Sequence, residues 1–400
     1  MANIGILTYH WVPNFGANLQ TLSTVGYIRK SGHNPIVINW IPEDLEAYYK
    51  NTTKDVQLEA HQSFQSHYGC LSSLCRSTKD IIDVIFSNKI DLIIIGSDAV
   101  LTYIPILNRF KLTRKGPRYI KAYKDSDFPS PFWADFKSQV NVPVAVMSAS
   151  AQNTRFKNIL FRKKRFAQQV KQFDYISVRD IWTSKMINYL TKGELTPRIT
   201  PDPVFSFNQN ISAECVISKE MIIKKYSLPD KYILLSIFRP IVSNDWLEQL
   251  SKLFQNNGIT IVYLPKSNII SYKPSNIRCI ELPIPPLDWY YLIKYSSGYI
   301  GELMHPILVS LHNSVPVYSI DTYGFKTNGK FNIHSSKILH ILTRFSLLGN
   351  VYNINTGKTF PSPESIYEII TSFNHEACSY EAKRCLDDYE SMMSDILKLI

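Results

Sequence analysis

The stretch Asn3-Ile-Gly-Ile-Leu-Thr-Tyr-His-Trp-Val-Pro-Asn-Phe-Gly-Ala-Asn-Leu-Gln20 carries the local signals that decide the fold. Its first seven residues predict a strand, and a loop then leads into a helix expected over residues 17–30. Asn14-Phe-Gly16-Ala17 opens this helix, and small residues there let backbone N–H groups approach an anion that the helix dipole attracts. An ordinary asparagine-capped turn explains the same residues, and spacing alone favours that interpretation. Gln20 follows one turn later, on the face nearest the loop.

The same alternation of strand and helix continues along the chain. Continuous apolar runs, typical of strands covered on both faces, predict strands at residues 36–40, 92–95, 142–147, 175–178, 232–238, 259–264, 278–282, 298–300 and 315–320. Helical patterns occupy residues 246–255, 288–295, 306–312, a segment from 363, and residues 380–400. Segments 41–90 and 101–135 have weaker patterns, and we expect irregular excursions over the sheet there.

This order of elements predicts an α/β fold with two Rossmann-like lobes built on parallel sheets. A chain of 400 residues exceeds what one core usually holds. Pro201-Asp202-Pro203 restricts the backbone and suggests a hinge or crossover between the lobes. We therefore expect domains at residues 1–205 and 206–370, with a closing helical segment at 371–400.

The composition fits a protein with an anionic partner, because the net charge is +11. Basic residues concentrate in segments 109–124 and 157–171. A solvated helix face is the first explanation, attraction to anionic lipid the second, and nucleic acid a distant third because no recognition motif is present. The N-terminus has no signal-peptide pattern and no apolar run is long enough to span a bilayer, so we expect a cytoplasmic protein. The six cysteines match no zinc or redox spacing, and we expect no metal site.

Polar residues at predicted strand ends are the candidates for chemistry, because ligands of open parallel sheets bind there. Ser97-Asp98 follows an apolar strand, and the Asp98 carboxylate is equally suited to accepting a sugar hydroxyl's proton or to capping a helix. Arg179 has the geometry to grip a phosphate or carboxylate, although pairing with Asp180 or Asp202 between the lobes is the favoured interpretation.

The second lobe has its own strand-end candidates. Glu302 and His305 follow a short strand and lead into a helix, and a histidine there titrates near neutrality and can transfer protons. Arg239, just after the strand at 232–238, is a candidate phosphate ligand in the same lobe.

Taken in order, these segments resemble the polysaccharide pyruvyl transferase family across almost the whole chain. The matching segments are Asn14–Gln20, Ile93-Ile-Ile-Gly-Ser-Asp98, Met147-Ser-Ala-Ser150, Ile176-Ser-Val-Arg-Asp180, Asp202-Pro203, Asp288-Trp-Tyr-Tyr-Leu-Ile-Lys-Tyr-Ser296, the turn at His305, Val315-Pro-Val317 and Ser336-Lys-Ile-Leu-His-Ile-Leu342. No single motif is decisive, but their order is specific.

The resemblance implies a two-lobed architecture similar to B-type glycosyltransferases. It implies phosphoenolpyruvate as donor substrate, no cofactor, and a sugar acceptor that is often lipid-linked, in a capsule, exopolysaccharide or wall polymer. The first domain would then be the acceptor side and the second the donor side. Such an acceptor fits peripheral contact with the inner face of an anionic membrane.

The chain departs from the family pattern in two places. Many relatives continue Gly-Ser-Asp with Gln-Val-Trp, where this chain has Ala99-Val100-Leu101. Many place glycine after the histidine, where this chain has Leu303-Met304-His305-Pro306, and proline removes one N–H that could bind phosphate.

The working hypothesis assigns the donor to Arg239, Glu302 and His305. His305 protonates the methylene carbon and Asp98 accepts the proton of the attacking hydroxyl. Asn14, Gly16, Ala17, Gln20 and Ser97 form the acceptor or anion side. A B-type glycosyltransferase using a nucleotide sugar and a non-catalytic glycan-binding protein are the alternative functions.

Overall fold

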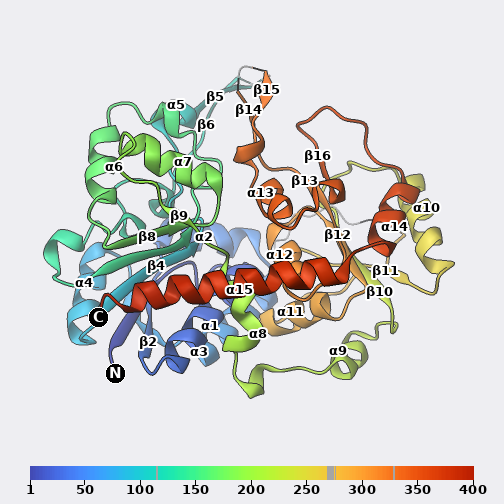
Figure 1. Ribbon diagram of the computed structural model, residues 1–400, viewed down its shortest axis with the longest axis horizontal. Coiled ribbons are helices and arrows are strands. Elements are labelled where there is room, and N and C mark those ends of the chain that lie inside the picture. Colours follow the sequence, from blue (N-terminus) through green and yellow to red (C-terminus); the bar gives the residue numbers. More distant parts are fainter. Residues whose placement is uncertain (114–115, 268–273, 275, 328) are drawn as a thin grey trace.

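The first lobe is built on a seven-stranded parallel sheet in the order β3-β2-β1-β4-β7-β8-β9 (Figure 1). The computed structural model describes residues 1–113, 116–267, 274, 276–327 and 329–400. The strands are β1 (Asn3–Leu7), β2 (Asn34–Trp40), β3 (Leu71–Cys75), β4 (Leu92–Asp98), β7 (Val144–Ala149), β8 (Tyr175–Val178) and β9 (Arg198–Ile199). Strands β4 and β7 are buried along their whole length, which explains their continuous apolar sequence.

Helices cover both faces of this sheet (Figure 1). They are α1 (Phe15–Lys30), α2 (Glu43–Thr52), α3 (Asp55–Tyr68), α4 (Thr78–Ser87), α5 (Ile106–Arg109), α6 (Lys163–Val170) and α7 (Ile181–Leu190). A small antiparallel hairpin of β5 (Phe110–Thr113) and β6 (Gly116–Tyr119) projects beside α5. Two residues of the first basic segment, 114–115, lie outside the described residues.

The second lobe repeats the plan with a five-stranded parallel sheet in the order β11-β10-β12-β13-β16. Its strands are β10 (Tyr232–Ser236), β11 (Thr260–Tyr263), β12 (Gly298–Gly301), β13 (Val317–Asp321) and β16 (Val351–Asn353). Its helices are α9 (Lys219–Tyr226), α10 (Asn244–Gln255), α11 (Pro286–Lys294), α12 (Met304–His312), α13 (Lys337–Arg344) and α14 (Pro363–Thr371). A two-stranded ribbon of β14 (Lys326–Thr327) and β15 (Lys330–Phe331) reaches toward the first lobe (Figure 1). The predicted α/β fold with two parallel sheets is confirmed.

Two predictions of local structure are wrong. Residues 41–90 are not irregular, because they hold α2, α3, β3 and α4. Helix α4 starts at a capping box in which Ser77 and Asp80 satisfy each other's backbone N–H groups, a signal present in the sequence. Residues 278–282 form no strand and make only an isolated bridge from Cys279 to Tyr263. Pro283 follows directly and offers no N–H for a ladder.

The lobes are joined through α1, α3 and the last helix. The rings of Phe15 and Trp289 stack with centroids 5.0 Å apart and planes 8° apart. The Gln57 side chain exchanges two hydrogen bonds with the backbone of Ile284, at 2.9 and 2.8 Å. Through these contacts the second lobe packs against α1 and α3 of the first lobe.

Helix α15 (His375–Leu397) runs along both lobes and ends near the N-terminus (Figure 1). Its last turns place Met392, Met393 and Ile396 in a core with residues of β1, β4 and β7. The C-terminal segment therefore packs on the first lobe as well as the second. The predicted boundary at 205 falls between β9 and β10 and that at 370 inside α14, and the boundaries themselves stay predictions. None of the helices in the described part of the chain is long and apolar enough to span a bilayer.

Candidate active site between the two lobes

A cavity of about 270 Å³ lies between the lobes, at the carboxyl ends of their strands. Both lobes contribute apolar and polar residues to its wall, with an acidic residue from the first lobe and basic residues from the second. The lining residues are Pro13, Asn14, Phe15, Tyr49, Asp98 and Gln152 from the first lobe, and Leu264, Pro265, Lys266, Ser267, Trp289, Leu303, Met304, His305, Pro306, Tyr323 and Lys337 from the second. Three predicted site residues, Asn14, Asp98 and His305, thus meet at one place.

Asp98 ends β4 in a strained backbone conformation, with φ at +77°. Its carboxylate accepts a hydrogen bond from Arg179, Nη2 to Oδ1, at 2.9 Å. Gly96 precedes it at φ +120°, and a Cβ there would come within 2.2 Å of the Met147 carbonyl oxygen, so the turn requires glycine. Burial alone would raise the pKa of Asp98, but the charges of Arg179 and His305 lower it overall. Asp98 is therefore held as a carboxylate.

Arg179 connects two carboxylates that lie far apart in the sequence. Its Nη1 lies 2.8 Å from Asp202 Oδ2, and its side chain is buried together with those of Asp98 and Asp202. Gln20 donates to the same Asp202 oxygen at 2.5 Å. The predicted pairing with Asp202 is present, whereas Asp180 caps α7 by accepting from Thr183. Each of the two carboxylates thus has a strong donor, and Arg179 serves as an internal bridge.

His305 stands in the first turn of α12 and is 9% exposed. Its Nε2 is buried and has no hydrogen-bond partner among the described residues. Its ring lies against Gly16, where a Cβ would come within 1.9 Å of His305 Cγ. Burial lowers the pKa of His305, against the opposing effects of Asp98 and Asp202. The lowered pKa favours the neutral imidazole near neutral pH, with one nitrogen available to a ligand.

Two lysines of the second lobe face the cavity, and the sequence reading missed both. Lys266 follows β11, and its ammonium lies 4.2 Å from the centroid of the Phe238 ring. Lys337 opens α13, with its ammonium 4.6 Å from the Tyr323 ring centroid. Burial lowers the pKa of Lys266, and the nearby Glu302 charge opposes that effect. The strand-end rule that selected Arg239 would also have selected Lys266.

Arg239 and Glu302 are paired with each other outside the cavity wall. Glu302 Oε1 accepts from the backbone N–H of Phe238 at 2.7 Å, and Oε2 lies 3.5 Å from Arg239 Nε. Glu302 is buried while Arg239 is half exposed. Neither residue lines the cavity, but both charges act on the pKa of Lys266: the Glu302 charge raises it and the Arg239 charge lowers it.

The predicted acceptor-side residues make hydrogen bonds or packing contacts within the first lobe. Asn14 caps α1 by accepting from the Gly16 N–H, so that donor is already engaged. Ala17 is buried, and Ser97 donates to the Ser148 carbonyl at 2.8 Å. Gln20 is occupied by Asp202. Their predicted contact with acceptor or anion stays a prediction.

The comparison with known families decides the identity of the chain. Residues 14–323 match the family model described as polysaccharide pyruvyl transferase, a span that runs from the Asn14 cap to Tyr323 on the cavity wall. The chain belongs to the polysaccharide pyruvyl transferase family. The predicted family is thus confirmed, and with it a transferase that acts on a sugar acceptor. No curated protein matches the chain closely enough to add to this assignment.

Solved structures show the same fold at low sequence identity. A UDP complex of Staphylococcus aureus MnaA has a TM-score of 0.52 at 14% identity, covering 100% of this chain and 98% of its own. A UDP-bound ugt transferase from Siraitia grosvenorii reaches 0.53 at 11%, covering 100% and 99%. A UDP-N-acetylglucosamine 2-epimerase from Rickettsia bellii reaches 0.52 at 10%, covering 99% and 96%. The predicted B-type glycosyltransferase architecture is confirmed.

The two departures from the family pattern lie in different surroundings. Ala99, Val100 and Leu101 are buried in the first-lobe core, so their change from the usual residues is a matter of packing. Leu303 and Pro306 line the cavity on either side of His305. Pro306 occupies the first turn of α12, where a missing N–H breaks no bond within the helix.

Proposed function

We propose that this member of the family transfers a pyruvyl group from phosphoenolpyruvate to two hydroxyls of one sugar in a polysaccharide precursor. The observation that supports this most is His305 Nε2, a buried nitrogen without a partner, in a cavity that also holds Lys266 and Lys337. A proton donor beside two cations suits a small dianion that must be protonated on carbon.

The donor's phosphate and carboxylate would be bound by Lys266 and Lys337. Both ammonium groups lie over aromatic rings rather than in tight ion pairs, so they keep donors for a ligand. Glu302 would act on the donor through Lys266, because its charge favours the protonated ammonium, whereas the Arg239 charge opposes it. Ligand anions in turn raise the pKa of His305, so donor binding itself charges the acid.

The reaction would begin with transfer of the His305 proton to the methylene carbon of phosphoenolpyruvate. The C=C electron pair forms the new C–H bond and leaves C2 as an oxygen-stabilised cation. A sugar hydroxyl attacks C2 and loses its proton. The C2–O bond to phosphate then breaks, inorganic phosphate leaves, and a second hydroxyl closes the ketal with loss of its proton. Each proton transfer is worth about 10²–10⁴-fold in rate.

Asp98 has two roles in the proposed reaction. Its carboxylate charge favours the protonated form of His305. It is also the proposed acceptor of the hydroxyl proton, although Arg179 makes it a weak base. A weak base suffices because attack on a cationic carbon acidifies the hydroxyl as the bond forms. Asn14 and Gln152, on the first-lobe wall, are the groups placed to orient the sugar.

The test is incubation of the protein with phosphoenolpyruvate and glycan precursors from the producing cell. Mass spectrometry should find one added pyruvic acid less water, with release of one phosphate per ketal. The proposed steps use no metal ion, so turnover should persist in a chelator. If no precursor fraction gains this mass and no phosphate is released, the proposal is wrong.

A nucleotide-sugar transferase is the second candidate, since two of the structures with this fold are complexes with UDP. Calorimetry separates the two candidates directly. Binding of UDP with no binding of phosphoenolpyruvate would favour the nucleotide sugar as donor. The reverse result would favour pyruvyl transfer.

We also propose contact with an anionic membrane surface through the top of the first lobe. Five apolar side chains of neighbouring segments are exposed there, and Phe161 is 98% and Leu112 92% exposed. The others are Ile106, Leu107 and Leu160. Exposed apolar groups of this size rarely cluster without a partner.

Hydrogen bonds and ion pairs hold these segments side by side. The Asn158 amide donates to Asn108 at 2.9 Å, and Asp127 pairs with both Arg109 and Arg162 at 2.8 and 3.7 Å. Basic residues lie in the same stretches of the sequence, namely Arg118, Lys121, Lys157, Lys163, Lys164 and Arg165. Exposed apolar side chains together with basic residues are complementary to an anionic lipid surface.

A further inference from the structure

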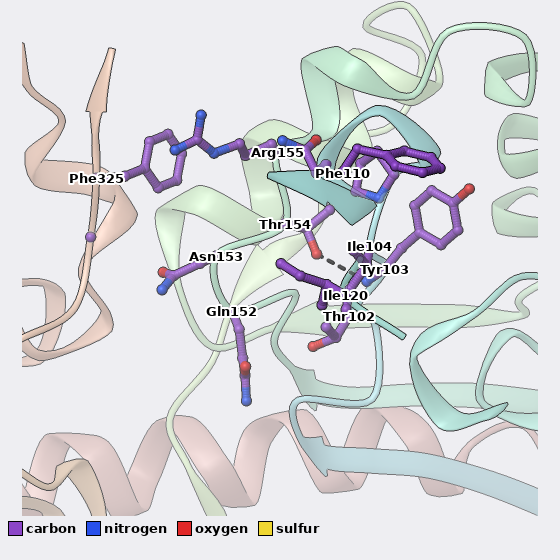
Figure 2. A pocket seen from close by; sticks show the side chains of 13 residues that line it. Thr102, Tyr103, Ile104, Phe110, Ile120, Gln152, Asn153, Thr154, Arg155 and Phe325 are labelled. Carbon is purple, nitrogen blue, oxygen red and sulfur yellow. Dashed lines mark hydrogen bonds between the residues drawn. The ribbon is translucent and has the colours of Figure 1, made fainter. Parts of the chain in front are cut away.

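A second and larger hollow of about 500 Å³ lies beside the candidate active site (Figure 2). Its walls come from the loop at 102–110 and the turn at 151–155 of the first lobe, and from Gly324 and Phe325 of the second. Its volume falls within the range of about 300–1,000 Å³ that small-molecule sites occupy. None of the steps proposed above uses this hollow, so its lining needs another explanation.

The hollow and the active-site cavity share one lining residue. Gln152 lines both spaces. It adopts a left-handed conformation with φ at +47°, which is strained for a residue other than glycine. Its backbone N–H donates to Ser150 Oγ at 3.1 Å, which holds the turn. A ligand that occupied both spaces would therefore contact Gln152.

Uncharged polar groups without partners are exposed to the hollow. The side chains of Gln152 and Asn153 project from the turn (Figure 2), and neither makes a hydrogen bond to the described residues. Amides both donate and accept, as sugar hydroxyls do, so they are matched to a ligand rich in hydroxyls.

Aromatic rings complete the lining. Phe110 and Phe325 stand apart in the lining, one from each lobe (Figure 2). Phe110 is 67% exposed, and the Arg155 guanidinium lies 4.9 Å from the Phe325 ring centroid. Aromatic faces carry negative charge density and attract the weakly positive C–H groups of a sugar ring. Phe110 and Phe325 therefore offer ring faces for sugars.

We propose that this hollow is a subsite for the sugar units next to the one that receives the pyruvyl group. The inference rests on the proposed function in one respect, that the reacting sugar occupies the neighbouring cavity. Gln152 marks the passage between the reacting unit and its neighbours. Phe110 and Asn153 strengthen the binding of longer glycans and do not take part in the reaction.

The experiment measures glycan binding as a function of chain length. The probes are size-fractionated partial hydrolysates of the producing cell's polysaccharides, with one, two or four sugar units, and binding is followed by saturation-transfer NMR. The four-unit fraction should bind at least about 10-fold more tightly than the one-unit fraction, a difference of about 1.4 kcal/mol. Phe110→Ala and Asn153→Ala should each reduce this advantage, and together they should abolish it. Both side chains are exposed, so the fold is retained.

Two controls keep the outcome specific. Phe161→Ala removes an even more exposed ring outside the hollow and should leave the length advantage unchanged. Phosphoenolpyruvate affinity, measured by calorimetry, should be the same in all variants. A length advantage that depends on Phe110 and Asn153 supports the subsite even if phosphoenolpyruvate fails to bind, in which case the proposed function alone is wrong. Absence of any length advantage, or an advantage that survives the double substitution, overturns the subsite.

Discussion

The imidazole of His305 rests on the backbone of Gly16, so closely that a single methyl group at position 16 would come within 1.9 Å of His305 Cγ. The two residues belong to different lobes, and each stands in the first turn of its helix, α1 or α12. The glycine of the N-terminal motif therefore acts on the second lobe. It makes room for the proposed acid where an anion site was expected.

Gly16→Ala should therefore impair catalysis by displacing His305. A displacement of about 1 Å costs about 10²-fold in rate when the geometry of a reacting group is affected. The measurement is kcat for ketal formation, with circular dichroism to verify the fold. Gly349→Ala is the matched control, because a Cβ there meets nothing within 4 Å. Equal kcat in both variants would show that the contact with Gly16 does not position His305.

The pH dependence should report the titration of His305. Without a bound anion, burial lowers the pKa of His305 below 6.5. The fraction of protonated His305 therefore falls as pH rises through this lowered pKa. Log kcat/KM for the donor should therefore decline across neutral pH. At saturating donor, the bound anion raises the pKa, so the decline of kcat should begin at higher pH.

His305→Gln should lower kcat by about 10²–10⁴-fold and remove both declines. His67→Gln, an exposed histidine of α3, should leave the profile as in the unmodified protein. Profiles for kcat and kcat/KM that coincide, or a profile unchanged by His305→Gln, would contradict the assignment of the acid.

Arg179→Met should destabilise the protein by about 3–5 kcal/mol, because it leaves the Asp98 and Asp202 carboxylates buried without their shared cation. The unfolding free energy in urea is the measurement. In the unmodified protein the pKa of Asp98 is lowered, so its stabilisation is present above the unfolded pKa and is lost as pH falls through the folded one. The loss caused by Arg179→Met should shrink at acid pH, where the carboxylates take up protons.

Arg198→Met is the control for this loss. Arg198 pairs with Asp388 and Asp395 at 3.5 and 3.6 Å on the surface, so its removal should cost no more than about 1 kcal/mol. Similar losses for the two substitutions would mean that burial does not decide the value of the Arg179 bridge.

Lys266→Met and Lys337→Met should each weaken donor binding. Loss of a charge-assisted hydrogen bond costs about 1.5–3 kcal/mol, or roughly 10–100-fold in affinity for phosphoenolpyruvate. Calorimetry measures this directly. Lys252→Met on α10, whose ammonium pairs with Glu248 at the surface, should bind phosphoenolpyruvate normally. Unchanged affinity in both cavity variants would place the donor elsewhere.

The exposed apolar group on the first lobe should bind anionic lipid. Cosedimentation with vesicles of phosphatidylcholine and phosphatidylserine should exceed that with phosphatidylcholine alone and fall with salt. Phe161→Ser with Leu112→Ser should remove most of the binding, since each apolar side chain contributes about 1.5–3 kcal/mol when buried. Phe86→Ser, which changes an exposed ring on α4, is the control. Equal sedimentation with both vesicle types would exclude this surface.

The two lobes and most of their strands could be predicted because a strand buried on both faces has a continuous apolar run in its sequence. In β4 all seven residues are buried, and the pattern is legible in the four consecutive apolar residues, 92–95, that open the strand. Where this pattern is weaker, as in β3 with its exposed residues, the prediction failed. The strand-end rule likewise selected Asp98, Arg179 and His305 from their positions alone.

What these residues do to one another was decided only by the tertiary structure. Asp98, Arg179 and Asp202 meet because the sheet places β4, β7 and β8 side by side and the chain then crosses at Pro203. Gly16 meets His305 only because α1 packs across the lobe boundary. The sequence by itself determined which residues stand at strand ends, because that depends on local periodicity. Which of them face a common cavity depends on strand order and lobe apposition, which no local pattern encodes.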